Sequence, residues 1–492
     1  MWTSFVIYFS YNFFFFMFLL LLVYQNSLTQ SFLNLQNIVF KKILLISSLF
    51  TFLFMFFYLT QLCFIYSSFH WSSNSYNSEF YTPVFNYFSI FTNSTNTTLI
   101  LDVYYYPFIY VFVLVTFLSV IFCMVYNQTE LNSFMIYISF IIVAGYLMFL
   151  TDSILLFFMA YEMLLVPSFF ILYKYAKTRK TVEASYLMFF WTQFGAMWII
   201  LGLLYITLTN QTSSFSLLTP LYFSTTEVNF LFTCFLLGFG VKLPIWPFYG
   251  WLPKAHVEAS TNFSIFLSGV LVKFAFFGLL KILVSIELEP TFIYAIPFLC
   301  IGIFDAVFKL FYQIDLKKLV AYATVVEMHW LTICLISGQS NLLLASFSML
   351  ISHAIISSNS FLLVDAISRR FKTRLVTEIS SINFTCPKLF LASLVNLLTF
   401  VGFPGSLFFV SEFLFFSFVM DFLPLMGILF LVLLYLLAPT FFFRSWMNVL
   451  FGYSNVLNKK LPVDLTSRES LLFSSLTILL YWLGYNWQSF LV

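Results

Sequence analysis

The sequence has few charged residues. Asp, Glu, Lys and Arg make up 8% of its 492 residues, whereas an ordinary soluble domain carries about 25%. Hydrophobic residues make up 62%, and a water-soluble fold cannot bury that much apolar surface. The composition therefore excludes a soluble globular protein and predicts a polytopic membrane protein. At about 20 residues per spanning helix, with short loops between helices, the length allows about 14 spans.

Cysteine is also scarce, and the net charge is small. No two of the six cysteines have the spacing of metal ligands, so the sequence predicts no metal site, no iron–sulfur site and no disulfide framework. A net charge of +3 does not indicate a nucleic-acid partner. Residues 1–40 contain no Lys or Arg, so we expect neither an Arg-rich transit peptide nor a secretory signal with a basic start. A mitochondrial location would then indicate synthesis inside the organelle.

Apolar runs between polar breaks predict an all-α fold with about 14 transmembrane helices. The cations support this topology, because all but three of the 22 Lys and Arg lie at or in loops that follow odd-numbered spans. Both termini are then expected on the outer side. Of the three exceptions, Lys281 lies near the opposite face, where a long side chain can snorkel, whereas Lys242 and Lys273 lie well inside spans. The predicted spans are 5–25, 41–66, 101–125, 131–150, 152–173, 185–209, 229–249, 263–286, 291–308, 318–336, 342–366, 388–419, 423–444 and 470–490.

Two of these spans are interrupted by residues that break helices. Gly240-Val-Lys-Leu-Pro244 interrupts one, and Gly402-Phe-Pro-Gly405 interrupts the other. Each is the fourth span in a group of five, and an odd number of spans makes the second group enter from the opposite face. Interrupted spans at matching positions are typical of transporters with inverted repeats. The predicted domains are residues 1–130 with three helices and a polar outer loop, 131–290 and 291–445 as inverted repeats, and 446–492 with the last helix.

Five ionisable residues lie deep within the predicted spans: Glu162, Lys242, Lys273, His353 and Glu412. A charge at the bilayer centre costs at least about 2.5–3.5 kcal/mol, so each should face a partner, water or the protein interior. Irregular backbone at this depth also needs protein or water to satisfy it, so the two interruptions indicate local hydration. The five residues are therefore predicted to form a proton path. Two further residues of the span 318–336 are possible members, Glu327 and His329.

Simpler structural roles remain open for these residues. Lys242 can cap carbonyl groups freed by Pro244, Glu162 can be a salt-bridge partner, and His353 can be a neutral core histidine bonded to a hydroxyl such as that of Ser352. A lysine exchanges protons near neutral pH only when burial favours its neutral form, which a nearby carboxylate opposes. Movement of Glu162 relative to Lys242 would then load or release a proton without any bound cofactor.

Several short motifs resemble one known family. Trp251-Leu-Pro-Lys-Ala-His-Val-Glu-Ala259, with Val241-Lys-Leu-Pro244 before it and Leu271-Val-Lys273 after it, is similar to a signature of the antiporter-like subunits of respiratory complex I, the proton-pumping NADH:ubiquinone oxidoreductase. The Lys-Ala-His-Val-Glu-Ala form is most similar to the chain 4 branch of that family. The resemblance covers about Asp102 to Arg444 and includes Tyr161-Glu-Met-Leu-Leu-Val-Pro167, Asp315-Leu-Lys-Lys-Leu-Val-Ala-Tyr322, Ser352-His-Ala-Ile-Ile-Ser-Ser358 and Leu391-Ala-Ser-Leu-Val-Asn396.

The resemblance implies roles for the five deep residues. Glu162 and Lys242 match the family's paired carboxylate and lysine, Lys273 and His353 match its central relay, and Glu412 matches the terminal group of the half-channel toward the outer side. Chains 2 and 5 resemble this sequence less, because they carry lysine at that last position, and chain 5 also has a long C-terminal lateral helix.

One position departs from the family's pattern. Where the family has a histidine in Ser-x-Ser-His-Met, this sequence has Glu327 in Thr324-Val-Val-Glu-Met. His329 lies two residues further on, which places it about 200° around the helix. Glu327 can substitute for that histidine in the proton path, so both residues are kept as possible members.

The resemblance implies a proton-translocating subunit of complex I in the mitochondrial inner membrane, with basic loops in the matrix and both termini toward the intermembrane space. It implies the antiporter-like chains 2 and 5 as neighbours, together with membrane lipid such as cardiolipin. FMN, iron–sulfur clusters and ubiquinone are expected on other subunits, and no cofactor on this chain. Two alternatives stay open: a subunit of a multisubunit cation/proton antiporter, and a non-conducting structural member of the membrane arm.

Overall fold

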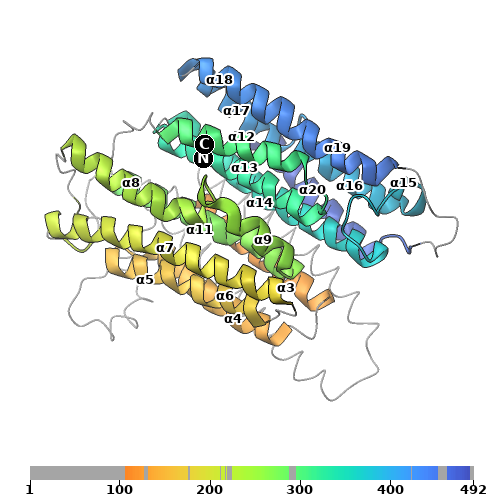
Figure 1. Ribbon diagram of the computed structural model, residues 1–492, viewed down its shortest axis with the longest axis horizontal. Helices are drawn as coiled ribbons and strands as arrows, with labels where there is room; N and C mark the ends of the chain where they lie inside the picture. Colours follow the sequence, from red (N-terminus) through yellow and green to blue (C-terminus); the bar gives the residue numbers. More distant parts are fainter. Residues whose placement is uncertain are drawn as a thin grey trace, which may run out of the picture. The chain divides into compact units, whose positions relative to one another are not determined.

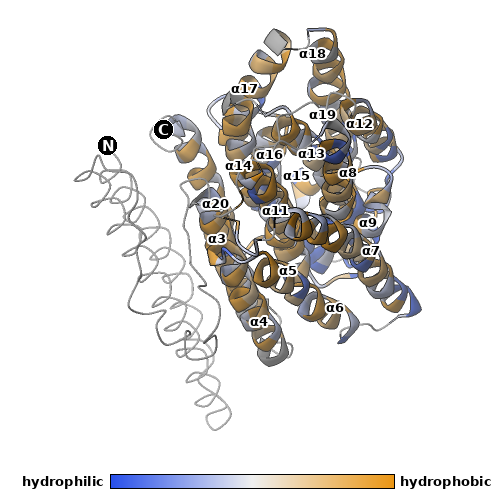
Figure 2. Cartoon of the chain, turned by 90° about the vertical axis from the view of Figure 1, so that its left-hand side faces the viewer, coloured by the Kyte–Doolittle hydropathy of each residue, from blue (hydrophilic) through white to orange (hydrophobic). Residues whose placement is uncertain are grey.

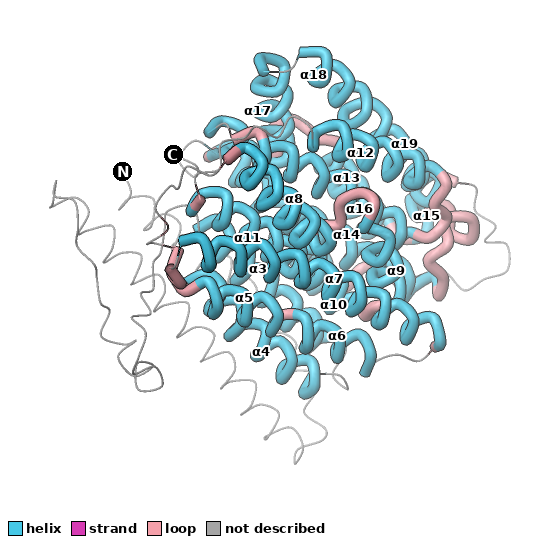
Figure 3. The backbone as a smooth tube through the Cα atoms, turned by 60° about the vertical axis from the view of Figure 1, so that its left-hand side comes forward, coloured by secondary structure: helices cyan, strands magenta, loops and turns pink. Residues whose placement is uncertain are grey.

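The computed structural model is almost entirely helical in the residues that it describes (Figures 1 and 3). Within them, β pairing is limited to two isolated bridges, Ser153 with Ser214 and Asp315 with Leu375. The predicted all-α class is thus confirmed for this part of the chain, whereas the predicted spans 5–25 and 41–66 and the polar segment after them lie outside it. The described residues are 106–126, 131–174, 178–210, 212–215, 218, 224–286, 295–338, 340–422, 424–452 and 462–487.

The chain divides into two compact units, and all described residues except Ser467–Ser475 belong to one of them. The described helices coincide with the predicted spans from 101–125 onward, and α9 and the short α15 are additional. Their bounds are α3 (Tyr106–Tyr126), α4 (Leu131–Leu150), α5 (Ile154–Met163), α6 (Leu165–Lys174), α7 (Arg179–Asn210), α8 (Thr225–Lys242), α9 (Trp251–Glu258), α10 (Thr261–Phe266), α11 (Val272–Ser285), α12 (Ala295–Phe311), α13 (Leu316–Ile336), α14 (Ser340–Phe371), α15 (Ile382–Thr385), α16 (Pro387–Phe400), α17 (Leu407–Phe422), α18 (Pro424–Phe430), α19 (Ala438–Phe451) and α20 (Ser467–Tyr485).

Length and hydropathy make many of these helices suitable for crossing a membrane. Figure 2 shows apolar residues along most helices. In the described part of the chain, six helical segments are long and apolar enough to span, and shorter apolar helices accompany them. The six are Ile154–Lys174, Arg179–Asn210, Thr261–Ser285, Leu316–Ile336, Leu342–Phe371 and Gly427–Phe451.

Three helical segments form the centre of the bundle. In the most apolar 18-residue stretch of Thr261–Ser285 and of Leu342–Phe371 every residue is buried. The corresponding share is 94% for Leu316–Ile336 but only 39% for Arg179–Asn210. Large apolar side chains such as Phe190, Met197 and Leu208 cover the outward face of α7. Such an apolar outer surface suits lipid or a partner subunit. The three central segments carry Lys273, Glu327, His329 and His353.

The first predicted interruption separates α8 from α9. Helix α8 ends at Lys242, a short 3-10 helix η4 (Phe248–Gly250) follows, and α9 begins at Trp251. The Trp251–Glu258 segment, which lies outside the predicted spans, forms the helix α9 after the interruption, with Trp251 and His256 buried. Pro244 and Pro247 lack an amide N–H, so the helix cannot run through this region unbroken.

The second predicted interruption separates α16 from α17. Gly402 and Gly405 have φ angles of +78° and +95°, in the left-handed region that glycine adopts without strain. Helix α17 restarts after Ser406, whose hydroxyl oxygen accepts a hydrogen bond from the Phe409 amide at 3.2 Å. This bond satisfies one of the free amide groups of the new helix. Both interruptions predicted from Gly and Pro are therefore confirmed.

Two turns of π-helix add further irregularity. They are η5 (Leu267–Leu271), which joins α10 to α11, and η7 (Leu431–Leu437), which joins α18 to α19. Single π turns inside α-helices are frequent at functional sites, because they release backbone groups from the regular pattern. The η5 turn ends two residues before Lys273, so it lies beside the most deeply buried lysine of the predicted path.

Two lysines that the sequence placed near the ends of spans have buried side chains. Lys281 does not snorkel but is buried, and its amino group donates a hydrogen bond to the Thr151 carbonyl among the rings of Phe157, Phe215 and Phe277. The sequence counted Lys317 with the loop cations, whereas it is buried in the first turn of α13 and donates to the Ala259 carbonyl at 2.9 Å. Side-chain length and local hydropathy cannot distinguish these buried lysines from surface ones.

Candidate functional site

A line of three ionisable side chains crosses the centre of the bundle. The Lys273 amino group lies 2.6 Å from Nδ1 of His353 and also donates to the Ser268 carbonyl in η5. On the other side of the imidazole ring, Nε2 of His353 lies 3.2 Å from Oε2 of Glu327, without the alignment of a hydrogen bond. All three residues are buried. His353 thus bridges a lysine of α11 and a carboxylate of α13.

This line continues into a cavity beside the second interruption. Glu327 and Glu412 both line the cavity, in which the centres of water molecules can occupy a volume of about 40 Å³. A water molecule needs about 10–15 Å³ on this measure, so two or three fit. The Oε1 atom of Glu327 and the Oε2 atom of Glu412 are buried and have no hydrogen-bond partner among the described residues. Water between the two carboxylates would satisfy both atoms.

Glu412 lies against the interrupted backbone. A Cβ atom built on Gly402 would come within 2.3 Å of Oε2 of Glu412. The missing side chain of Gly402 therefore makes room for this carboxylate, as well as permitting the positive φ angle. The interrupted backbone at Gly402 therefore forms part of the wall around the Glu412 carboxylate.

Lys242 lies in the first half of the bundle, at the last residue of α8. Its amino group donates to the Tyr161 carbonyl at 3.3 Å and lies 3.4 Å from the centre of the Tyr161 ring. Glu162 follows Tyr161 directly, and its Oε1 atom is buried without a hydrogen-bond partner in the described part of the chain. The predicted partners are therefore neighbours, but the lysine contacts the backbone and ring of Tyr161 and forms no ion pair with Glu162 within 4.0 Å.

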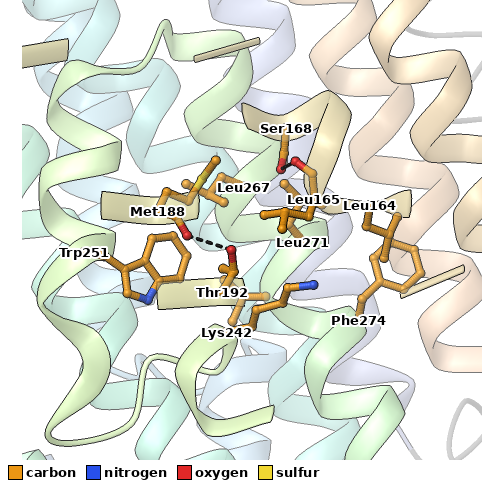
Figure 4. A pocket seen from close by; sticks show the side chains of 11 residues that line it. Leu164, Leu165, Ser168, Met188, Thr192, Lys242, Trp251, Leu267, Leu271 and Phe274 are labelled. Atoms are coloured by element: carbon orange, nitrogen blue, oxygen red, sulfur yellow. Dashed lines mark hydrogen bonds between the residues drawn. The ribbon is translucent and has the colours of Figure 1, made fainter. Parts of the chain in front are cut away.

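A second cavity adjoins Lys242 (Figure 4). The centres of water molecules can occupy a volume of about 30 Å³ in it, which is enough for about two water molecules. Figure 4 shows the Lys242 amino group turned toward the side of the pocket where Leu164 and Phe274 lie. The wall includes Leu271, Val272 and Phe274, which flank Lys273 in the sequence. The cavity at Lys242 thus reaches the helix that carries the central lysine.

His329 is not part of the central line. Its Nε2 accepts a hydrogen bond from the Trp246 amide at 2.8 Å, and its Nδ1 lies 2.8 Å from the Val325 carbonyl. Both ring nitrogens therefore engage backbone groups. The two possible members of the path are separated by the structure, because Glu327 joins His353 while His329 faces the interruption between α8 and α9.

The geometry of the central line suits the transfer of protons. An imidazole ring can accept a proton at one nitrogen and release one from the other, and lysine and glutamate can each exchange one. No group of three or more His, Cys, Asp and Glu in the part of the chain that the structure describes could hold a metal ion. The chemistry that this arrangement supports by itself is acid–base chemistry.

A hydrogen bond from the Trp251 side chain stabilises the interruption after α8, and we expect its loss to lower the stability of the protein measurably. The Trp251 indole donates to the Val241 carbonyl at 2.9 Å, because the Ile245 amide that would serve it in a regular helix bonds to Gly240 instead. Trp251→Phe leaves this buried carbonyl unpaired and should cost about 1–3 kcal/mol, measured as a lower unfolding temperature of the assembled protein. Trp191→Phe on α7 removes an indole that donates no hydrogen bond in the described chain, and an equal loss there would contradict this role.

Comparison with known proteins identifies the family. The family model described as "NADH:quinone oxidoreductase/Mrp antiporter, TM" matches residues 151–438, which include all seven candidate residues. The NADH-ubiquinone oxidoreductase chain 4 of Paramecium tetraurelia is 36% identical over 330 residues, which cover 66% of this chain and 69% of that relative. The chain belongs to the NADH-ubiquinone oxidoreductase chain 4 family. The resemblance inferred from the motifs is thereby confirmed.

Solved structures share the fold of this chain 4 family member. A chain of respiratory complex I from Thermus thermophilus with bound NADH has a TM-score of 0.67 at 20% identity, over 82% of this chain and 88% of that one. A chain of the Mrp complex from Dietzia sp. DQ12-45-1b has the same TM-score at 16% identity, over 78% of this chain and 82% of that one. At such identities the likeness concerns the fold alone.

The structure of this chain 4 family member also contains buried polar residues that sequence reasoning did not select. His256 of α9 stacks on the Phe361 ring with centroids 4.8 Å apart, and both of its ring nitrogens are buried without a hydrogen-bond partner in the described chain. The side-chain amide of Asn262 is unpaired in the same way. Their signal in the sequence is weak, because Lys254 and Glu258 flank His256 and Ser260 and Thr261 precede Asn262.

Proposed function

We propose that this chain is a proton-translocating membrane-arm subunit of respiratory complex I. It would be part of an NADH:ubiquinone reductase without performing redox chemistry itself. The observation that carries the proposal is the buried line from Lys273 through His353 to Glu327, which leads into a cavity shared with Glu412. Burying ionisable groups in this way costs several kcal/mol per group, so a purely structural bundle gains nothing from them.

Proton transfer along this line would use each group in turn. Lys273 passes a proton to Nδ1 of His353, the imidazole releases one from Nε2 to Glu327, and water in the 40 Å³ cavity carries it to Glu412. Glu162 and Lys242 would supply the first half of the path, with water in the second cavity next to Lys242. In this proposal Glu327 takes the place of the histidine that the family resemblance implied.

The positions of the interruptions support a pair of inverted repeats at residues 131–290 and 291–445, within about 14 spans. The helix α8/α9 and the helix pair α16/α17 are each interrupted, and each interruption adjoins a cavity lined by an ionisable residue. Interrupted helices at matching places in two halves are the pattern expected of such transporters. Residues 1–130 and 446–492 would flank the repeats.

The setting of the chain follows from the same proposal. The structural neighbours are chains of the Mrp complex and of respiratory complex I, which supports partner subunits such as the antiporter-like chains 2 and 5. The location would be the mitochondrial inner membrane, with basic loops in the matrix, both termini toward the intermembrane space, and lipid such as cardiolipin around the apolar faces. FMN, iron–sulfur clusters and ubiquinone would be held by other subunits, so the energy would reach this chain through its neighbours.

Replacing either member of the first-half pair tests the proposal. We expect Glu162→Ala and Lys242→Ala to reduce NADH-driven proton pumping of the assembled complex by less than the roughly 100-fold that a positioned proton-transfer group contributes. The loss should be partial, because water in the adjacent cavity can replace part of the pathway. Pumping is measured in membrane vesicles with a pH-sensitive dye, alongside NADH oxidation. Glu183→Ala and Lys254→Ala remove exposed side chains of the same two types and should pump normally. Normal pumping by the assembled Glu162 and Lys242 variants would refute the proposal.

Transport measurements in the same vesicles, together with the flavin content of the purified complex, distinguish the proposal from its alternatives. A subunit of a multisubunit cation/proton antiporter would exchange sodium for protons without any flavin or quinone reductase activity in the purified complex. A non-conducting structural subunit would leave pumping unchanged in every assembled variant. The family model covers both oxidoreductase and Mrp members, so the flavin content of the native complex is the deciding measurement between the first two.

A further inference from the structure

The imidazole of His329 is held in one tautomer by two backbone groups. The Trp246 amide can only donate and the Val325 carbonyl can only accept, so Nε2 of His329 must be the acceptor and Nδ1 must carry the proton. Protonation of Nε2 would place two N–H groups against each other at 2.8 Å. His329 is completely buried, so this conflict could not be relieved by turning to solvent. The residue is therefore unsuited to carry protons and suited to hold the backbone.

The group that His329 holds belongs to the interruption between α8 and α9. Trp246 lies between Pro244 and Pro247, after the last residue of α8, so its amide has no place in either helix. An unpaired amide at this depth would cost free energy. His329 comes from α13, on the other side of the predicted repeat boundary, and supplies the missing acceptor. Trp246 is the fourth residue after Lys242.

The backbone of α12 packs closely against the same imidazole ring at Gly302. A Cβ atom on Gly302 would lie 2.1 Å from Nε2 of His329, 2.4 Å from its Cδ2 atom and 2.8 Å from Cβ of Trp246. No side chain fits between these groups. Gly302, His329 and Trp246 therefore form a three-part contact in which the glycine provides the space for the ring.

A second contact between the same elements fixes the other end of the interruption. The Tyr249 hydroxyl donates to the Asp305 carboxylate of α12 and accepts from the Lys309 amino group at 2.6 Å. Lys309 and Asp305 form a salt bridge of 2.8 Å, and the Tyr249 ring lies 6.1 Å from the His329 ring. The ionisable groups around this segment are therefore paired with each other, and His329 makes the contact with the interrupted backbone itself.

We propose that His329 is a positioning residue that holds the interruption between α8 and α9 and thereby sets the position of Lys242. The inference rests on the proposed function, because Lys242 matters only if the chain moves protons. Releasing the Trp246 amide would loosen the chain just after α8, and the Lys242 amino group would lose its fixed place beside the Tyr161 carbonyl and Glu162. Pumping would fall although no proton carrier was removed.

Three variants in the assembled complex test this role. We expect His329→Leu, which lacks an acceptor, and Gly302→Ala, which displaces the ring, to speed hydrogen exchange of the peptide containing Trp246 by about tenfold and to shift the pH profile of NADH-driven pumping. His329→Gln places an amide oxygen near the position of Nε2 and should restore both readouts. Gly250→Ala is the matched control, because nothing lies within 4 Å of the added Cβ atom. If His329→Leu does not assemble, Gly302→Ala still tests whether loss of the contact with the Trp246 amide changes both readouts.

The outcomes separate this inference from the proposed function. If His329→Gln pumps as poorly as His329→Leu while protecting the Trp246 amide, His329 carries protons and the positioning role is wrong. Unchanged exchange at Trp246 in both His329→Leu and Gly302→Ala would also overturn it. If Lys242→Ala pumps normally, the proposed function fails, and exchange at Trp246 still decides whether His329 holds the interruption.

Discussion

Lys273→Met is expected to reduce NADH-driven proton pumping by roughly 100-fold or more, the range that a positioned proton-transfer group contributes. Lys273 is buried and contacts Nδ1 of His353 at 2.6 Å, so it occupies the central step of the proposed path. Methionine has a similar length and keeps the helix packed, so the complex should assemble. The measurement is the pumping rate of vesicles relative to their rate of NADH oxidation.

A second substitution at the same position separates charge from proton exchange. Arginine keeps the positive charge but does not deprotonate in proteins, so Lys273→Arg should assemble with the charge in place and pump as poorly as Lys273→Met. Lys254→Met, on the exposed side of α9, makes the same chemical change away from the line and should leave pumping intact. Substantial pumping by Lys273→Arg would show that charge alone suffices and that Lys273 passes no proton.

Gly402→Ala is expected to have the largest effect on stability, because two penalties coincide at one residue. A φ angle of +78° strains any residue with a Cβ atom by about 1–3 kcal/mol. The added methyl group would also lie 2.3 Å from Oε2 of Glu412, and such overpacking adds about 1–3 kcal/mol. The unfolding temperature of the assembled protein should fall, and pumping should fall further because Glu412 is displaced from its cavity.

Two other glycines isolate these penalties. Gly405 has a φ angle of +95°, but an added Cβ atom would lie 3.7 Å from the nearest atom of Tyr481, an ordinary contact. Gly405→Ala should therefore lose stability through strain while retaining most pumping. Gly250→Ala has neither penalty, since its backbone is helical and its surroundings are open. If Gly402→Ala and Gly405→Ala lose pumping equally, the contact between Gly402 and Glu412 has no functional importance.

The helices and their interruptions were predictable because they depend on neighbouring residues. Hydropathy located most helices from α3 onward, and Gly402, Pro404 and Gly405 located the second interruption, because proline removes a backbone hydrogen bond and glycine loosens the helix. Hydropathy gave no sign of α9, because Pro253, Lys254 and Glu258 interrupt the apolar pattern of Trp251–Glu258. In the structure that segment is helical because its apolar side packs against the bundle, with Trp251 and His256 buried.

The partners of the buried charges were not predictable in the same way. Sequence paired Lys242 with Glu162, whereas the structure turns its amino group to the Tyr161 carbonyl. Sequence left Glu327 and His329 equivalent, and packing separated them into a member of the central line and a backbone acceptor. Sequence placed Lys281 and Lys317 near the ends of spans but gave no indication that their side chains are buried. Each of these results depends on which side of a helix meets which neighbour.

The sequence by itself determined that this is a helical membrane protein, where two of its helices are interrupted, and that several ionisable residues lie deep within its helices. These properties follow from the composition of short segments and from the backbone preferences of Gly and Pro. The tertiary structure alone decided that Lys273 meets His353 across 80 residues of chain and that Glu327 extends their line. In a membrane bundle the helices are apolar on nearly every side, so periodicity does not reveal which face packs inward, and only packing brings distant side chains together.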